Sequence, residues 1–244
     1  MTLINKNSPI PLYYQLKELL REKIENGEMN PHERVPSETE LTQMFNISRM
    51  TSRHALIELE NDGLVYREQG KGTFVAEPKL RQKLPKLTGF TEDMRVRGLK
   101  AGAKVLDVQV ILGDKDLAIK LGASSDEEFV KIQRVRFADD VAMAVETVFL
   151  RRKFCEGIEK IDLNNRSLYE TLRTEYGIRL GRAEQILEPT LADEYEAEIL
   201  GIDVGKPLLF IEGTAFLEDG LTAIEYTCSA YRGDRYRFYV ELEK

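Results

Sequence analysis

Two short helical segments separated by only two residues constrain the fold of this chain more than any other feature. The first segment opens on a capping box, in which Ser37 is followed three residues later by Glu40. After residues 46–47, Ser48 is a second N-cap candidate, and the pattern behind it stays helical to about Asp62. The sequence therefore predicts two helices joined by a tight turn.

The flanking segments complete the order of elements. Residues 12–27 carry apolar side chains at helical spacing and end on a glycine. Behind the capped helices, the strand-like runs 64–68 and 72–77 are joined by a turn that contains Gly70 and Gly72. Glycine supports the positive φ angles that hairpin turns need. Three helices followed by a β-hairpin is the order of a winged helix-turn-helix domain.

The pattern changes beyond this first domain. Residues 77–86 are polar, contain two prolines and are predicted to be a linker. Farther on, strand-like runs pair as hairpins around short turns, with helical runs between the pairs. We expect an α+β fold, with a winged helix-turn-helix domain at 1–76, a linker at 77–86 and an antiparallel-sheet domain at 87–244. The expected strands are 104–111, 129–137, 142–150, 182–192, 208–217 and 223–231, and the expected helices are 165–176 and 193–200.

Composition excludes several classes of function. The only two histidines are His32 and His54, so no imidazole is available beyond them for catalysis or a metal site. The chain has no P-loop and no strand-linked G-x-G-x-x-G. Cys155 and Cys228 lie far apart in the sequence and are predicted to be free thiols. No apolar run reaches the roughly 18 residues that span a bilayer. We expect a cytoplasmic protein with no membrane contact, metal or cofactor.

The second capped helix has the features of a DNA-reading element. Residues 41–57 contain no acid, and Arg49 and Arg53 lie four positions apart on one helix face. A recognition helix places its N-terminal residues on base edges in the major groove, where arginine commonly reads guanine. Arg67 and Lys71 lie on the hairpin, where a wing meets the neighbouring DNA backbone. Ser and Thr at these positions can reach phosphates.

The net charge of the first domain favours a different interpretation. Residues 1–76 contain nine Lys and Arg against eleven Asp and Glu, a net of about −2, whereas a nucleic-acid footprint is usually basic. Solvated arginines on a small helical domain are therefore the alternative. Six of these acids fall before the second helix is well under way, and the local potential at a contact face matters more than the sum.

Four stretches of the first domain carry a family resemblance: P-I-P-L-Y-Y-Q-L, V-P-S-E-T-E-L, F-N-I-S-R-M-T-S-R-H-A-L and L-E-N-D-G-L-V-Y-R-E-Q-G-K-G-T-F-V. Together they resemble the GntR family of bacterial transcription regulators. The resemblance implies that Arg49, Arg53 and the wing glycine Gly70 contact operator DNA. Many members have a base-reading arginine where this chain has Thr39, so the operator is expected to differ there. The predicted DNA-contacting set is Ser37, Thr39, Ser48, Arg49, Thr51, Ser52, Arg53, Arg67, Gly70 and Lys71.

The second domain carries L-T-G-F-T-E-D-M at 87–94, R-V-R-F-A-D at 134–139 and S-A-Y-R-G-D-R-Y-R-F at 229–238. These stretches resemble the HutC subfamily, which implies a chorismate-lyase-like (UTRA) fold that binds a small-molecule effector. The all-helical, histidine-rich effector domains of other GntR proteins do not fit a segment with several strands and no histidine. The aminotransferase-like effector domains are too long.

Several residues of this domain suit an anionic ligand. Arg134 and Arg136 are two apart on a predicted strand and so leave the same face. Ser167 and Tyr169 lie at the start of a predicted helix, where free N–H groups and the dipole favour anions. The resemblance to amino-sugar sensors of the subfamily implies that these groups hold a phosphate. It gives the effector-binding set Phe90, Thr91, Arg134, Arg136, Glu146, Ser167, Tyr169, Glu225 and Tyr231.

Plain structural roles also explain some of these residues. Arg134 falls opposite Glu146 across the predicted hairpin, so the two can form a cross-strand ion pair without any ligand. Ser167 can be a helix cap only, and Tyr231 a core aromatic only.

The predicted function is a homodimeric, ligand-responsive repressor that binds double-stranded operator DNA. Its effector is expected to be glucosamine-6-phosphate or N-acetylglucosamine-6-phosphate. Other members of the subfamily sense trehalose phosphate, urocanate, fatty acids or phosphonates, so another effector class is the alternative. A lyase-type enzyme is a further hypothesis, because fold does not fix function, but an enzyme gains nothing evident from a winged helix. The last hypothesis is a purely architectural DNA-binding protein that responds to no small molecule.

Overall fold

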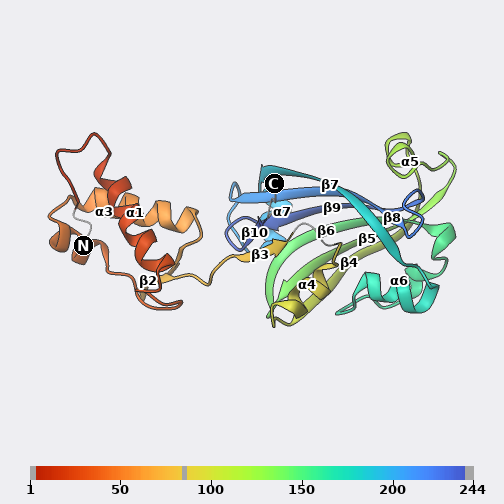
Figure 1. The fold of residues 1–244 in the computed structure, drawn as a ribbon, viewed down its shortest axis with the longest axis horizontal. Coiled ribbons are helices and arrows are strands. Elements are labelled where there is room, and N and C mark those ends of the chain that lie inside the picture. The colour runs from red at the N-terminus through yellow and green to blue at the C-terminus, as the bar shows by residue number, and fades with distance from the viewer. Residues whose placement is uncertain (1–3, 84–86, 240–244) are drawn as a thin grey trace, which may run out of the picture. The chain divides into compact units, whose positions relative to one another are not determined.

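The computed structural model describes residues 4–83 and 87–239 and divides the chain into two compact units, with the boundary between Leu80 and Arg81 (Figure 1). Residues 84–86 of the predicted linker lie outside the described part. The first unit contains three helices and a hairpin, in the predicted order: α1 (Leu12–Glu25), α2 (Glu38–Phe45), α3 (Arg49–Asn61), β1 (Val65–Glu68) and β2 (Gly72–Val75).

The predicted caps position α2 and α3. Ser37 Oγ accepts a hydrogen bond from the Glu40 amide at 3.3 Å, and the Ser37 amide donates to Glu40 Oε2 at 2.7 Å. Ser48 Oγ accepts from the Thr51 amide at 3.1 Å. Because each cap satisfies amides that the helix leaves unpaired, both helices start where the sequence predicts. Their buried faces meet in one core, which includes Leu16, Leu20, Leu41, Ala55, Leu56 and Leu59.

The second unit is built on a six-stranded antiparallel sheet with the strand order β4-β5-β6-β9-β8-β7. This confirms an α+β fold. Its strands are β4 (Ala101–Leu112), β5 (Glu128–Ala138), β6 (Val141–Arg151), β7 (Leu180–Leu191), β8 (Pro207–Leu217) and β9 (Ala223–Arg232), and its helices are α4 (Phe90–Val96), α5 (Lys115–Leu121), α6 (Leu168–Tyr176) and α7 (Glu194–Leu200), with 3-10 turns at Arg152–Phe154 and Ile158–Lys160.

Helices cover both faces of the sheet. Leu168 and Leu172 of α6 pack with Val130, Ile132 and Val148 on one face. On the opposite face, α7 joins an apolar cluster that contains Val145, Leu208 and Ala230, and α5 joins one that contains Phe129 and Tyr226. Alternate residues of one strand thus enter different cores, as the period of two requires.

The β5–β6 hairpin has the predicted register. Asp139 and Asp140 both have positive φ angles, 45° and 67°, which is the backbone of a two-residue hairpin turn. The two strands that the turn joins pair Arg134 with Glu146, as expected. The hairpin register therefore places both arginines and this carboxylate in the middle of the sheet.

Three parts of the structure differ from the sequence expectations. The helices α4 and α5, each seven residues long, were not predicted. The helix predicted from Asn165 begins at Leu168, because Asn165 has a φ of 52° and Ser167 is the N-cap. Within the predicted linker, β3 (Leu80–Lys83) pairs with β10 (Tyr236–Tyr239) in a separate two-stranded sheet.

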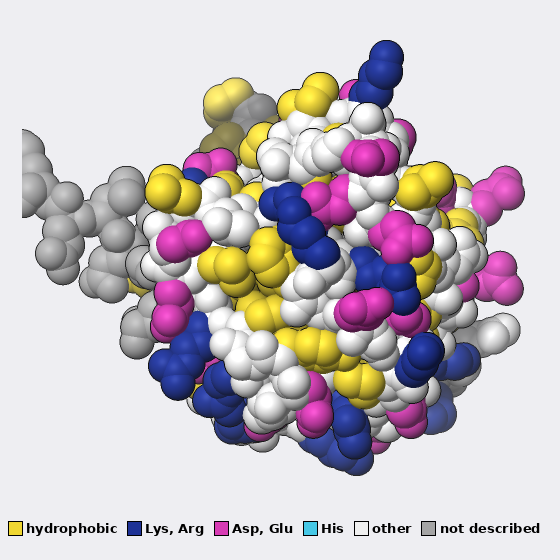
Figure 2. All heavy atoms as spheres, turned by 90° about the vertical axis from the view of Figure 1, so that its right-hand side faces the viewer, with side chains coloured by type: hydrophobic (Ala, Val, Ile, Leu, Met, Phe, Trp, Pro, Cys, Tyr) yellow, Lys and Arg dark blue, Asp and Glu magenta, His cyan; other side chains and the backbone are white. Residues whose placement is uncertain are grey.

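Figure 2 shows one end of the second unit, where Lys and Arg side chains alternate with Asp and Glu around smaller apolar areas. Such a mixed surface has no single-sign field on this face that would attract a polyanion. In the part of the chain that the structure describes, no helix is both long and apolar enough to cross a membrane.

The α7 cap gives a stability prediction. Asp193 Oδ1 accepts a hydrogen bond from the Glu196 amide at 2.7 Å, so the Asp193→Ala variant is expected to lose about 1 kcal/mol of unfolding free energy. The loss is measured by urea denaturation of the second unit. The control is Glu198→Ala, an exposed site on the same helix, which should stay within about 0.5 kcal/mol of the parent. Equal losses in both variants would contradict the role of the cap.

Candidate nucleic-acid interface and ligand pocket

A surface depression in the first unit lies between the starts of α2 and α3 and the β1–β2 hairpin. It brings together residues from three segments that are separate in the sequence. Its lining includes Ser37, Thr39, Arg49, Arg67 and Gly70 of the predicted DNA-contacting set. A helix start beside a hairpin is the surface with which a winged helix meets a groove and the adjacent backbone.

Three cations of the predicted DNA-contacting set are paired with half-exposed carboxylates. Arg53 is exposed and has no ion pair to any residue that the structure describes. The three paired cations are Arg49 with Glu38 at 3.1 Å, Arg67 with Glu60 at 3.2 Å and Lys71 with Glu68 at 2.8 Å. Exposed pairs of this kind contribute little to stability, so phosphates can replace the carboxylates at small cost.

Ser52 is a correction to the predicted set. Its side chain is 0% exposed, and its hydroxyl lies 3.2 Å from Thr42 Oγ1 and 3.4 Å from the Ser48 carbonyl oxygen. Because Ser52 belongs to the buried stripe of α3, it joins α3 to α2 and is not available to DNA. Ser48 and Thr39 are exposed, whereas Thr51 is half-buried.

Arg34 also lines the depression and was not predicted. It forms an isolated β-bridge with Phe74 of the hairpin. Gly72 has a φ of +130°, and a Cβ there would lie 3.2 Å from Arg34 Nε. The glycine therefore lets the Arg34 side chain lie against the hairpin. No sequence signal marks this arginine, because it lies in the loop before α2.

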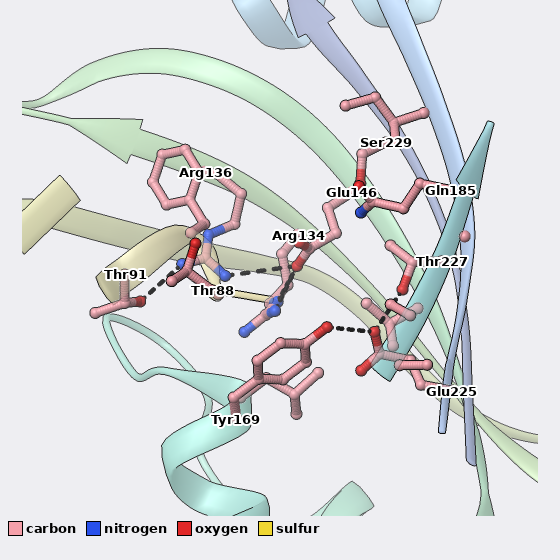
Figure 3. A pocket seen from close by; sticks show the side chains of 18 of the residues that line it. Thr88, Thr91, Arg134, Arg136, Glu146, Tyr169, Gln185, Glu225, Thr227 and Ser229 are labelled. Carbon is pink, nitrogen blue, oxygen red and sulfur yellow. Dashed lines mark hydrogen bonds and ion pairs between the residues drawn. The ribbon is translucent and has the colours of Figure 1, made fainter. Parts of the chain in front are cut away.

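A pocket in the second unit lies between the sheet and the starts of α4 and α6 (Figure 3). All nine residues of the predicted effector-binding set line it. Phe90 and Thr91 come from α4, Ser167 and Tyr169 from the start of α6, and the others from three adjacent strands: Arg134 and Arg136 from β5, Glu146 from β6, and Glu225 and Tyr231 from β9.

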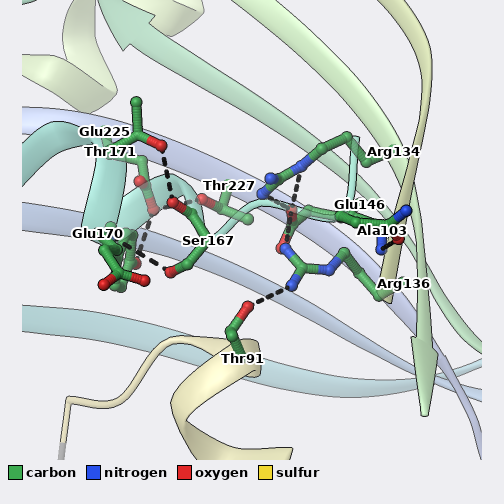
Figure 4. A network of polar contacts seen from close by, with 12 residues as sticks. Thr91, Ala103, Arg134, Arg136, Glu146, Ser167, Glu170, Thr171, Glu225 and Thr227 are labelled. Atoms are coloured by element: carbon green, nitrogen blue, oxygen red, sulfur yellow. Dashed lines mark hydrogen bonds and ion pairs between the residues drawn. The ribbon is translucent and has the colours of Figure 1, made fainter. Parts of the chain in front are cut away.

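Two buried arginines share one carboxylate at the centre of the pocket. Arg134 and Arg136 are 1% and 3% exposed. Arg134 donates from Nε to Glu146 Oε1 at 3.1 Å and from Nη2 to the same oxygen, and Arg136 Nη1 lies 3.5 Å from it (Figure 4). Burial alone would raise the pKa of Glu146, but the two guanidinium charges outweigh it and hold that pKa below its usual value. The cross-strand ion pair is thus present.

Arg136 also connects the sheet to α4. Its Nη2 donates to Thr91 Oγ1 at 3.0 Å, and its guanidinium lies 4.7 Å from the centre of the Phe90 ring. Both contacts are on the first two residues of α4. The orientation of this short helix therefore depends on a side chain that faces the pocket.

Glu225 is the second buried carboxylate. Its Oε1 accepts hydrogen bonds from Tyr169 OH at 2.9 Å and from Thr227 Oγ1 at 2.8 Å. Burial raises the pKa of Glu225 to about 7, although both hydrogen bonds oppose the shift. Burial likewise raises the pKa of Tyr169, so its hydroxyl stays a donor. The pocket can therefore hold a neutral or a charged Glu225 near neutral pH.

Three buried polar atoms of this pocket have no hydrogen-bond partner among the described residues: Arg134 Nη1, Arg136 Nε and Glu225 Oε2. A buried polar atom without a partner costs free energy, so several in one cavity point to groups that arrive from outside. Two donors lie on the arginine side and one carboxylate oxygen lies on the other. The pocket is thus suited to a ligand with an anionic end and a polar end.

Ser167 has both roles that the sequence left open. Its hydroxyl accepts from the Glu170 amide at 3.3 Å, so it caps α6, and it also lines the pocket. Tyr231 packs against Tyr236 with ring centres 4.6 Å apart, and it too faces the cavity. The geometry gives these residues a structural role without removing them from the wall.

Sequence reasoning missed several polar wall residues. Thr227 and Ser229 lie between Glu225 and Tyr231 at every second position of β9 and so point to the same face. The period of two could therefore have found them. Gln185 of edge strand β7 has no such signal, because most of that strand is exposed. Among the residues described, no group of three or more His, Cys, Asp or Glu side chains is placed to hold a metal.

Comparison with known proteins matches each of the two units to a known domain family. The sequence model for "Bacterial regulatory proteins, gntR family" matches residues 12–75, and the model for "UTRA domain" matches residues 96–237. A winged helix joined to a UTRA domain is the architecture of a ligand-controlled regulator of transcription. The chain belongs to the GntR family, in its HutC branch, and is a transcriptional repressor with a UTRA effector-binding domain.

Relatives match nearly the whole chain. The HTH-type transcriptional repressor NagR of Bacillus subtilis (strain 168) is 45% identical over 241 residues, which cover 99% of this chain and 98% of that protein. The histidine utilization repressor of Pseudomonas putida is 32% identical and covers 83% of this chain and 81% of its own length. The crystal structure of PhnF from Mycobacterium smegmatis has a TM-score of 0.66 and 31% identity, covering 93% of this chain and 98% of that one.

Glu225 gives a pH prediction. Its pKa is about 7 in the folded protein against an ordinary 4.5, so the folded state binds the proton more tightly. Stability due to this group is complete below about pH 4.5 and is lost as the pH rises through 7. The Glu225→Gln variant keeps an acceptor for Tyr169 but cannot ionise. It is expected to be more stable than the parent by about 3 kcal/mol at pH 8.

The measurement is the difference in unfolding free energy between the two proteins at pH 5 and pH 8. Taking the difference cancels the other titrating groups. A gap of similar size at both pH values would contradict the burial of an ionisable Glu225.

Proposed function

We propose that this repressor binds operator DNA as a homodimer and is controlled by a phosphorylated amino sugar. The observation that carries the proposal is the pair of buried guanidiniums beside buried carboxylates in one pocket, with unpartnered atoms of both kinds. Such a pocket offers donors to an anion at one end and acceptors to hydroxyl or amino groups at the other.

The arginine side of the pocket suits the phosphate. Arg134 Nη1 and Arg136 Nε each have a free donor there among the described contacts, and Thr91 adds a hydroxyl. The start of α6 adds amides and the positive end of the helix dipole. Since Glu146 neutralises only one of the two guanidiniums, the site keeps a positive charge for the phosphate whenever Glu225 is protonated.

The opposite side suits the sugar. Glu225 presents its unpartnered Oε2, and Thr227, Ser229, Tyr231 and Gln185 add hydroxyl and amide groups around it. Hydroxyl and amino groups of a sugar would satisfy these atoms, whereas a fatty acid would leave them unpaired at a cost. The resemblance to regulators of amino-sugar use supports the same choice.

Effector binding and operator binding would be coupled through α4. This helix begins shortly after the linker, and Arg136 holds its first two residues. A phosphate that takes hydrogen bonds from Arg136 would change what α4 contacts. In a dimer on a pseudo-palindromic operator, effector and DNA then favour different arrangements of the winged helices, and binding of one opposes the other.

A ligand panel tests the effector. Glucosamine-6-phosphate and N-acetylglucosamine-6-phosphate are expected to raise the melting temperature, because a ligand at 100 times its Kd stabilises by roughly 2.7 kcal/mol. The unphosphorylated sugars, trehalose-6-phosphate and urocanate should produce little shift. The Arg136→Met variant should lose the response. A shift with urocanate or trehalose-6-phosphate alone would replace the amino-sugar assignment.

Arg49 tests the DNA contact. The Arg49→Ala variant is expected to lose about 1–3 kcal/mol of operator binding and to discriminate less between sequences. Fluorescence anisotropy with cognate and scrambled DNA at fixed salt measures both effects. The control is Lys23→Ala, which removes a cation that is paired with Glu28 at 3.0 Å on another part of the unit. Equal weakening on cognate and scrambled DNA would make Arg49 a phosphate contact.

A further inference from the structure

The outward face of α3 is fixed by the residues that the helix buries. Ser52, Ala55, Leu56 and Leu59 are buried and follow the spacing of one helical stripe. At about 100° per residue, the position directly opposite this stripe in the first turn is Met50. The first-turn position of α3 that faces most directly away from the domain core is therefore a methionine.

Met50 is 70% exposed. The neighbouring positions on the same face belong to Arg49 and Arg53 on one flank and His54 on the other. The His54 ring stacks on Tyr13, with ring centres 3.9 Å apart, so it is directed back toward α1. Met50 thus lies between the arginine pair and a histidine that is already packed, and among the described residues it is not part of the hydrophobic core of the unit.

We propose that Met50 determines operator specificity by contacting the C5-methyl group of a thymine in the major groove. The inference rests on the DNA-binding function of the first unit. The N-terminal residues of a recognition helix are those that reach base edges. Of the groups that base pairs present in the major groove, the thymine methyl is the apolar one, and a thioether is a flexible, polarizable partner for it.

Thr39 and Ser52 add little hydrogen-bonded reading of bases in this unit. A threonine there cannot make a bidentate contact with guanine, and Ser52 is withdrawn into the core. Of the side chains at the start of α3 that face away from the core, Arg49 and Arg53 donate hydrogen bonds and Met50 does not. Each half-site is therefore expected to contain a thymine beside the guanines that the arginines read.

The test is a thermodynamic cycle that removes one methyl group at a time. An operator is first selected from random DNA with the full-length protein, and each thymine in it is then replaced by deoxyuridine. Anisotropy titrations give the Kd of the parent and of Met50→Ala on every oligonucleotide. The parent is expected to bind about fourfold more weakly for each sensed thymine that is replaced, which corresponds to the roughly 0.8 kcal/mol of one buried methyl-sized group, and about fifteenfold more weakly when the thymine is replaced in both half-sites.

The Met50→Ala variant should bind the thymine and deoxyuridine forms of that site equally, while Met50→Leu should retain part of the discrimination. Met44→Ala is the matched control, because Met44 is a 64% exposed methionine near the end of α2, and it should discriminate as the parent does.

If no thymine replacement weakens the parent, or if Met50→Ala keeps the full discrimination at every thymine, the proposal is wrong. If the protein selects no sequence at all, the operator-binding function itself fails, and that result is distinct from a selected operator whose thymines are not sensed.

Discussion

The second unit depends on holding two guanidiniums in the middle of a β-sheet. Arg134 and Arg136 leave the same face of β5 and are almost completely buried, with Glu146 as their shared partner. Removing charges from water costs several kcal/mol per ion, and apolar residues in their place are often as stabilising. An arrangement that is expensive for folding and incompletely hydrogen-bonded is therefore best understood as prepared for a ligand. The turn at Asp139 and Asp140, the β6–β9 pairing and the short helix α4 all position groups around these two side chains.

The first unit handles charge in the opposite way. The cations of its predicted DNA-contacting surface are exposed, and three of them are paired with carboxylates, as for Arg49 with Glu38 and Lys71 with Glu68. Such pairs are weak in water and are screened by salt. They lower the attraction of the unit for any polyanion, so binding has to come from contacts that fit a particular sequence. The net negative charge of residues 1–76 is thus compatible with a DNA-binding surface.

Local sequence patterns such as helix caps and turns predicted most of the secondary structure. The remaining features depend on contacts between residues that lie far apart in the sequence. Capping residues located α2 and α3, and the Asp139–Asp140 turn set the register that puts Arg134 opposite Glu146. Thr227 and Ser229 share one face of β9 with Glu225 and Tyr231, so the period of two, once applied along the whole strand, would have included them. Ser52 was misplaced because a serine near a helix start resembles a polar surface residue, while its hydroxyl is in fact satisfied by Thr42 inside the domain. Gln185 and Arg34 depend on neighbours far away in the sequence, and no local pattern predicts them.

The contact between α4 and β10 bears on how the chain acquires its structure. Tyr236 OH donates to Asp93 Oδ2 at 3.1 Å, across 143 positions of sequence, and Phe238 of the same strand lines the pocket. The winged helix, by contrast, is made of neighbouring segments with short connections. Domains tend to fold from the N-terminus during synthesis, and contacts between distant residues form slowly. The DNA-binding unit can therefore complete its fold during synthesis before the pocket that controls it exists.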